Sequence, residues 1–135
     1  CDFDAIAMDR QGLPAVDPAA CVACGDCVTA CPRDLFALVP EALRVHVACR
    51  NPLAGDAILE ECRVACTACA RCASDAPTSI RMQDGLPVLA RERPPPREAI
   101  DRCPTGAIVW LDDAGRAHRG RAAPRIVRQQ PLPVA

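Results

Sequence analysis

Two stretches of the chain share one pattern of short apolar runs separated by a glycine turn. Residues 5–16 contain such a pair of runs around Gly12, and residues 79–89 contain another around Gly85. Short apolar runs joined by a glycine-containing turn are typical of paired strands. Because the pattern occurs twice, it predicts a repeated strand–turn–strand unit.

The segment between these two copies predicts one further strand and one helix. Residues 44–48 alternate between polar and apolar, as a half-buried strand does. Asn51 is a favourable N-cap, and Pro52 suits the first helical position. Apolar residues at 57–59 and at Val64 then predict a helix that ends near residue 64.

Composition changes this picture because the chain is poor in the residues that build large cores. Its 135 residues include two Phe, one Trp and no Tyr, but eleven Cys. Small scaffolds with so few aromatic residues are usually held together by disulfides or by metal. An odd cysteine count excludes complete disulfide pairing within one chain. The net charge of −1 also gives no basic footprint for nucleic acid.

The first residues show no secretion signal, and no apolar run approaches the roughly 18 residues of a membrane span. These observations predict a cytoplasmic, reducing setting with no membrane span in the chain. In such a setting metal is favoured over disulfides.

The strongest chemical signal is a run of four cysteines with the spacing Cys-x2-Cys-x2-Cys-x3-Cys-Pro. Its members are Cys21, Cys24, Cys27 and Cys31. This is the spacing of bacterial ferredoxins, in which the first three thiolates bind one [4Fe–4S] cluster and the fourth serves another. Gly25 suits the close approach of backbone to a cluster. A zinc site would need two Cys-x-x-Cys pairs with a spacer, which this run does not provide.

A second triplet consists of Cys66, Cys69 and Cys72, and the remote Cys103 precedes a proline. In ferredoxins a remote Cys-Pro cysteine completes such a triplet, so these four residues predict one complete site. The positions expected for its companion site hold Ala76, Arg93, Pro96 and Ala99 instead. This half is therefore expected to be a two-cluster ferredoxin that retains one cluster.

The first triplet needs a fourth ligand, and Cys1 is favoured over Cys62. Cys1 heads a turn that resembles residues 103–108 and precedes a strand–turn–strand unit. Cys31, Cys49 and Cys62 then remain. They could hold a third cluster, with His46 or a residue upstream of Cys1 as its fourth ligand, or they could be thiols packed as small apolar groups. The expectation is two [4Fe–4S] clusters, or three if this set also binds one.

These motifs resemble a known family. Residues 12–17, 21–32, 35–40, 45–49, 62–69 and 103–108 match its pattern. The region is similar to the ferredoxin-rich B subunit of Rnf-type ferredoxin:NAD oxidoreductase complexes. The resemblance implies a component of a hetero-oligomeric redox complex, with protein donors and acceptors, on the cytoplasmic face of a membrane to which it is attached only through partners.

The fold class expected from all these patterns is α+β, with small bacterial-ferredoxin-like modules in two pseudo-repeated lobes. The lobes are predicted at residues 1–48 and 49–115, and residues 116–135 form a basic, proline-containing tail that is either solvated or docks on an acidic partner. The expected function is electron transfer without a catalytic site, since no Gly-x-Gly-x-x-Gly loop or Ser/His/Asp array is present. The alternative is a structural iron–sulfur or zinc module that organises a partner's surface.

Overall fold

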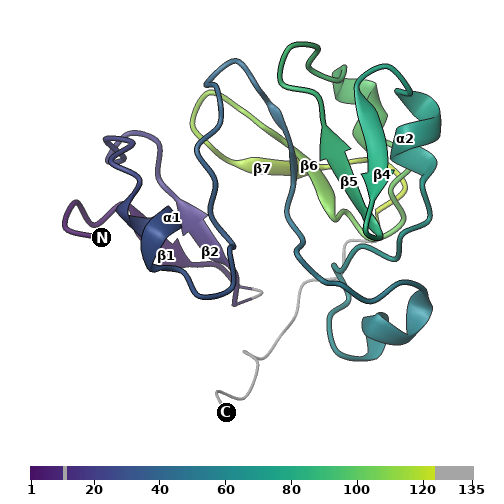
Figure 1. Cartoon of the computed structure of the whole chain (residues 1–135), viewed down its shortest axis with the longest axis horizontal. Coiled ribbons are helices and arrows are strands. Elements are labelled where there is room, and N and C mark those ends of the chain that lie inside the picture. The colour runs from purple at the N-terminus through teal and green to yellow at the C-terminus, as the bar shows by residue number, and fades with distance from the viewer. Residues whose placement is uncertain (11, 124–135) are drawn as a thin grey trace. The chain divides into compact units, whose positions relative to one another are not determined.

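The computed structural model describes residues 1–10 and 12–123, and the chain separates into two units (Figure 1). Unit 1 contains residues 1–38 and 113–115, and unit 2 contains residues 39–112 and 116–123. Both units mix short helices with antiparallel strands, which agrees with the predicted α+β class. None of the helices formed by the described residues is long and apolar enough to cross a membrane.

Unit 1 consists of one hairpin and one short helix. Strand β1 (Ile6–Met8) pairs antiparallel with β2 (Pro14–Val16), as the glycine turn predicted, and α1 spans Asp26–Ala30. Ala5, with 2% of its surface exposed, is the one buried residue among those described in this unit. Because so little apolar surface is buried, packing alone contributes little to the stability of unit 1.

Unit 2 contains a three-stranded sheet, a second hairpin and three short helical segments. These are β3 (Val45–Val47), the 3-10 helix η1 (Asp56–Glu60), α2 (Arg71–Asp75), β4 (Ile80–Gln83), β5 (Leu86–Leu89), the 3-10 helix η2 (Arg97–Ile100), β6 (Ile108–Leu111) and β7 (Ala117–Arg119). The sheet has the order β3–β6–β7 and is antiparallel throughout, while β4 pairs with β5 as predicted. A buried core joins the sheet to α2, β4 and η2 through Val45, Cys72, Ala76, Ile80, Ala99, Ile100, Cys103, Ala107 and Ile108.

The predicted helix from Asn51 to Val64 is wrong over most of its length. The structure has only the 3-10 turns of η1 in this region. The Asn51 side chain accepts a hydrogen bond from the N–H of Leu53 at 3.1 Å and donates one to its carbonyl at 2.9 Å. Such local bonds compete with a helix. Gly55 follows with φ of 86°, which a helix does not accommodate.

Two predicted boundaries also differ from the structure. Strand β3 pairs with β6 and therefore belongs to unit 2, which places the boundary after Leu38 rather than after Ala48. The predicted tail from Arg116 begins with β7, which pairs with β6 through Trp110 and His118. Residues 124–135 of that tail lie outside the described residues.

Candidate metal centres

The four cysteines predicted as one site in the second half line a single pocket of unit 2. They are Cys66, Cys69, Cys72 and Cys103. Cys66 and Cys69 come from the loop that leads into α2, Cys72 lies in the first turn of α2, and Cys103 comes from the turn before β6. Cys72 and Cys103 are buried, whereas Cys69 is exposed. The structure therefore brings a sequence-local triplet and a remote cysteine to one place, as the motif requires.

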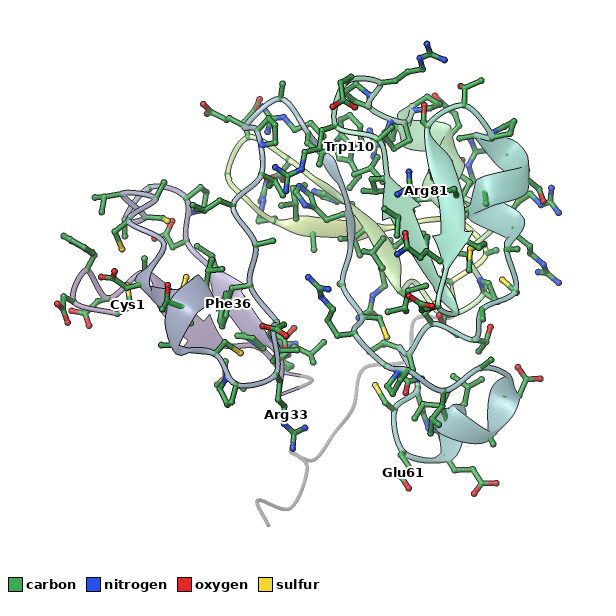
Figure 2. All side chains as sticks on the ribbon, viewed as in Figure 1. Cys1, Arg33, Phe36, Glu61, Arg81 and Trp110 are labelled. Atoms are coloured by element: carbon green, nitrogen blue, oxygen red, sulfur yellow. The ribbon has the colours of Figure 1, made fainter. Side chains whose placement is uncertain are left out.

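The other pocket, in unit 1, is lined by Cys1, Cys21, Cys24 and Cys27. Among the two alternatives for the remote cysteine, the structure places Cys1 beside the triplet, whereas Cys62 belongs to unit 2. In the turn that carries Cys1, the N–H of Asp4 donates a hydrogen bond to the carbonyl of Cys1 at 3.3 Å. Asp4 has φ of 52°, and Gly106, at the same position after Cys103, has φ of 73°. Cys1, the first residue of the sequence, is labelled in unit 1 in Figure 2.

The two triplet loops share an unusual backbone. Ala23 and Gly25 in the first loop have φ of 56° and 83°, and Ala68 and Ala70 at the matching positions have φ of 58° and 59°. Left-handed alanine is strained by roughly 1–2 kcal/mol, so it persists only where surrounding structure requires it. In each loop the second of these residues is the N-cap of the helix that follows. The triplets are thus held by one and the same loop shape.

Backbone N–H groups point at the sulfurs in both loops. The N–H of Ala23 donates to Cys21 Sγ at 3.4 Å, and the N–H of Ala68 donates to Cys66. In unit 2, Thr105 also places its hydroxyl 3.8 Å from Cys103 Sγ. Such donors stabilise sulfur that carries negative charge. The sequence analysis missed Thr105, because the cysteine spacing gives no sign of this hydroxyl.

In unit 2, the pKa of the remote cysteine is shifted in the opposite direction from the pKa of two cysteines of the triplet. Burial raises the pKa of Cys72 to about 11, only partly offset by the N–H of Ala73, and it also raises the pKa of Cys66. Burial acts on Cys103 in the same direction, but N–H groups of Ile108, Thr105 and Ala107 together with the Thr105 hydroxyl outweigh it, so the pKa of Cys103 is lowered.

Metal binding opposes the raised pKa of Cys66 and Cys72, because coordination to a cation deprotonates a thiol. The donor set of each pocket fits an iron–sulfur group, since four thiols converge with backbone donors around them. Among the described residues, no three His, Cys, Asp or Glu side chains are grouped closely enough to hold a single metal ion.

The remaining cysteines lie outside both pockets. Cys31 is in unit 1 and accepts the N–H of Leu35 at 3.4 Å. Cys49 is in unit 2, where its Sγ accepts the N–H of Asn51 at 3.4 Å and of Cys66 at 3.3 Å. Cys49 therefore contacts the triplet loop without lining its pocket.

The other two residues considered for a third centre, Cys62 and His46, both belong to unit 2. Cys62 closes the turn after η1, because its N–H donates to the carbonyl of Ile58 at 2.8 Å. His46 lies on β3 opposite Val109. Burial lowers the pKa of His46, and the backbone of Leu43 partly opposes this shift.

Two of the positions predicted for a companion site in the second half are filled by buried apolar side chains. Ala76 and Ala99 are 5% and 2% exposed, and both belong to the core of unit 2. Pro96 caps η2, which packs against α2, and Arg93 is exposed. The two alanines contribute to a continuous hydrophobic contact at positions where cysteines would otherwise point at a cluster.

Comparisons with known proteins agree with this geometry. Residues 13–36 match the family described as 4Fe-4S binding domain. This match includes the first triplet and, together with the cysteines of the chain, supports [4Fe–4S] clusters, as the cysteine spacing predicted.

Two curated relatives show which proteins the wider region is similar to. The B subunit of the Na(+)-translocating ferredoxin:NAD(+) oxidoreductase complex of Acetobacterium woodii is 48% identical over 66 residues, which are 49% of this chain and 20% of the relative. The B subunit of the ion-translocating oxidoreductase complex of Methanosarcina acetivorans is 33% identical over 94 residues, or 69% of this chain and 36% of the relative. The matched region thus spans about a fifth of the first relative and about a third of the second. The chain carries a ferredoxin region like that of these B subunits, as predicted from its motifs.

Proposed function

We propose that this chain is an electron-transfer subunit with one [4Fe–4S] centre in each unit. The observation that carries the proposal is the convergence of two separate sets of four thiols, each on its own pocket. A cluster accepts and releases one electron without making or breaking bonds to a substrate. The residues of this chain bind the cluster, orient its thiolates and supply the N–H donors that set its potential.

The assembly that we propose for this chain is supported by the names of its relatives. Each is named as the B subunit of an oxidoreductase complex, which supports a place for this chain in a hetero-oligomeric redox complex. We infer in addition that the chain lies on the cytoplasmic side. Its donor and acceptor are redox proteins, and catalysis on a substrate belongs to other subunits. The matching loops and turns of the two pockets support pseudo-repeated ferredoxin-like lobes as the origin of the fold.

A structural role is the second candidate, and the small core of unit 1 favours it. With Ala5 as its one buried described residue, unit 1 needs metal to fold in the way that small metal-bound domains do. The two roles differ in one measurable property. A relay centre is reduced and reoxidised reversibly by a mediator, whereas a purely structural centre stays in one state over the same potentials.

The decisive experiment measures iron, zinc and acid-labile sulfide in anaerobically prepared protein, with EPR of the reduced form. Two cubanes require about eight irons and eight sulfides per chain. Reversible reduction with the EPR signal of [4Fe–4S]+ supports the relay. Zinc without sulfide refutes it.

The same preparation tests a third centre at the cysteines outside both pockets. About twelve irons per chain would establish it. In that case Cys31→Ser and Cys49→Ser should each lower the iron content by about four, while leaving the other two centres intact. An iron content unchanged by both substitutions makes these cysteines packing residues.

A further inference from the structure

Thr105 places a buried hydroxyl inside the turn that carries Cys103. Only 6% of the surface of Thr105 is exposed, and its hydroxyl lies 3.8 Å from Cys103 Sγ, within hydrogen-bond reach of the large sulfur atom. A buried hydroxyl without a partner is costly, so this contact satisfies a group that is shielded from water. A thiolate that binds metal carries no proton. In the loaded centre the Thr105 hydroxyl is therefore the donor and the sulfur is the acceptor.

This hydroxyl is a side-chain donor among backbone donors to the same sulfur. The N–H groups of Ile108, Thr105 and Ala107 also donate to Cys103. Every residue except proline has an N–H, so most substitutions leave these backbone donors in place. A hydroxyl, by contrast, depends on the identity of the side chain. Position 105 is thus a place where the sequence controls a hydrogen bond to a cluster ligand.

The matching turn of unit 1 has no hydroxyl at this position. Alignment of Cys1 with Cys103 places Phe3 at the position of Thr105. The turns agree in backbone at the next residue, where Asp4 and Gly106 both have positive φ. The Phe3 side chain is apolar and cannot donate to sulfur. The same turn therefore holds both remote cysteines, but position 105 gives a hydroxyl donor to Cys103 alone.

A donor to sulfur changes the potential because reduction adds negative charge to the cluster and its ligands. Hydrogen bonds to sulfur favour the more negative state and therefore raise the potential. Burial acts in the opposite direction, since it disfavours charge, and two of the four thiols in unit 2 are buried, whereas three in unit 1 are exposed. A hydrogen bond is also stronger away from water. The Thr105 hydroxyl thus acts in the more buried of the two centres, where its effect is largest.

We propose that the Thr105 hydroxyl raises the reduction potential of the centre in unit 2, a contribution that the centre in unit 1 lacks. The inference rests on the proposed function and deepens it, since it names a side chain that sets one potential of the relay. The couple is the one-electron reduction of [4Fe–4S]2+ to [4Fe–4S]+, and a redox protein supplies the electron. The hydroxyl keeps its proton in both states and acts only through Cys103 Sγ.

The test is an anaerobic redox titration of the cluster-loaded full chain with dithionite and mediators, followed by EPR. Thr105→Val removes the hydroxyl and keeps the shape of the side chain. It should lower the equilibrium constant for reduction of the unit 2 centre by about tenfold, which is about 59 mV for a one-electron couple. The potential of the other centre should stay unchanged. Thr105→Ser keeps a hydroxyl and should restore most of the wild-type potential.

The matched control is Thr78→Val, which makes the same change at an exposed position of unit 2 that does not line the pocket. Both potentials should keep their wild-type values in this variant. The unit 2 centre is identified as the one whose EPR signal is absent from Cys69→Ser. Thr105→Ala is a second variant without the hydroxyl and should lower the same potential, which keeps the test decisive if Thr105→Val does not load.

Three outcomes would overturn the proposed role of Thr105. They are an unchanged unit 2 potential in a loaded variant without the hydroxyl, an equal shift in Thr105→Ser, and loss of the centre from both Thr105→Val and Thr105→Ala. The last outcome would make the hydroxyl a requirement for holding the cluster. Absence of a reducible cluster from the wild-type chain would instead overturn the proposed function itself.

Discussion

Gly120 offers a sharp test of the packing around the C-terminal strand. It is buried directly after β7, and a Cβ at this position would press on the carbonyl oxygen of Ile100 and lie 2.6 Å from Asp101 Cα. Both contacts are with backbone, which cannot rotate away as a side chain can. We therefore expect Gly120→Ala to destabilise unit 2 by about 3 kcal/mol, the upper part of the range for overpacked sites. For a unit of this size that lowers the midpoint of thermal unfolding by roughly 12–24 °C.

The assay is anaerobic thermal unfolding of the cluster-loaded protein, followed by circular dichroism at one fixed scan rate. Ala122→Ser is the control, because Ala122 is exposed two residues further on and should change stability by less than about 0.5 kcal/mol. If residues 116–123 belonged to a solvated tail, which was one of the two alternatives drawn from sequence, neither substitution would change the stability. An unchanged midpoint for Gly120→Ala would therefore refute the packing of residues 117–120 on unit 2.

Three further predictions concern the thiols and their loops. Cys69→Ser should lower the iron content by about four per chain and leave the EPR signal of the other centre unchanged; loss of both signals would mean that the units do not fold independently. Cys1→Ser should remove the centre of unit 1, whereas Cys62→Ser should retain it, and the reverse outcome would transfer the fourth ligand to Cys62. Ala70→Gly should raise the thermal midpoint, because it relieves left-handed strain of about 1 kcal/mol that Gly25 avoids in the matching loop; a lower midpoint would contradict that account.

The elements that were predicted well depend on local sequence. The hairpins around Gly12 and Gly85 form where the glycine-containing turns predicted them. A short turn brings adjacent strands together and does not depend on contacts with the rest of the chain. The helix predicted after Asn51 was wrong for a related reason. Asn51 is a good helix cap, but the same side chain also closes a local turn on Leu53, and the pattern of apolar residues does not distinguish these two uses.

The sequence by itself determined the chemistry of this protein, because the spacing of Cys21 to Cys31 and of Cys66 to Cys72 fixes which thiols share a loop. The sequence also predicted Cys103 as the remote partner of the second triplet, but only the tertiary structure decided between Cys1 and Cys62 for the first. It placed Cys1 beside the first triplet and Cys103 beside the second, and it added β7 to the edge of β6. These outcomes depend on contacts between residues far apart in the chain, whose energies come from packing that no local spacing records.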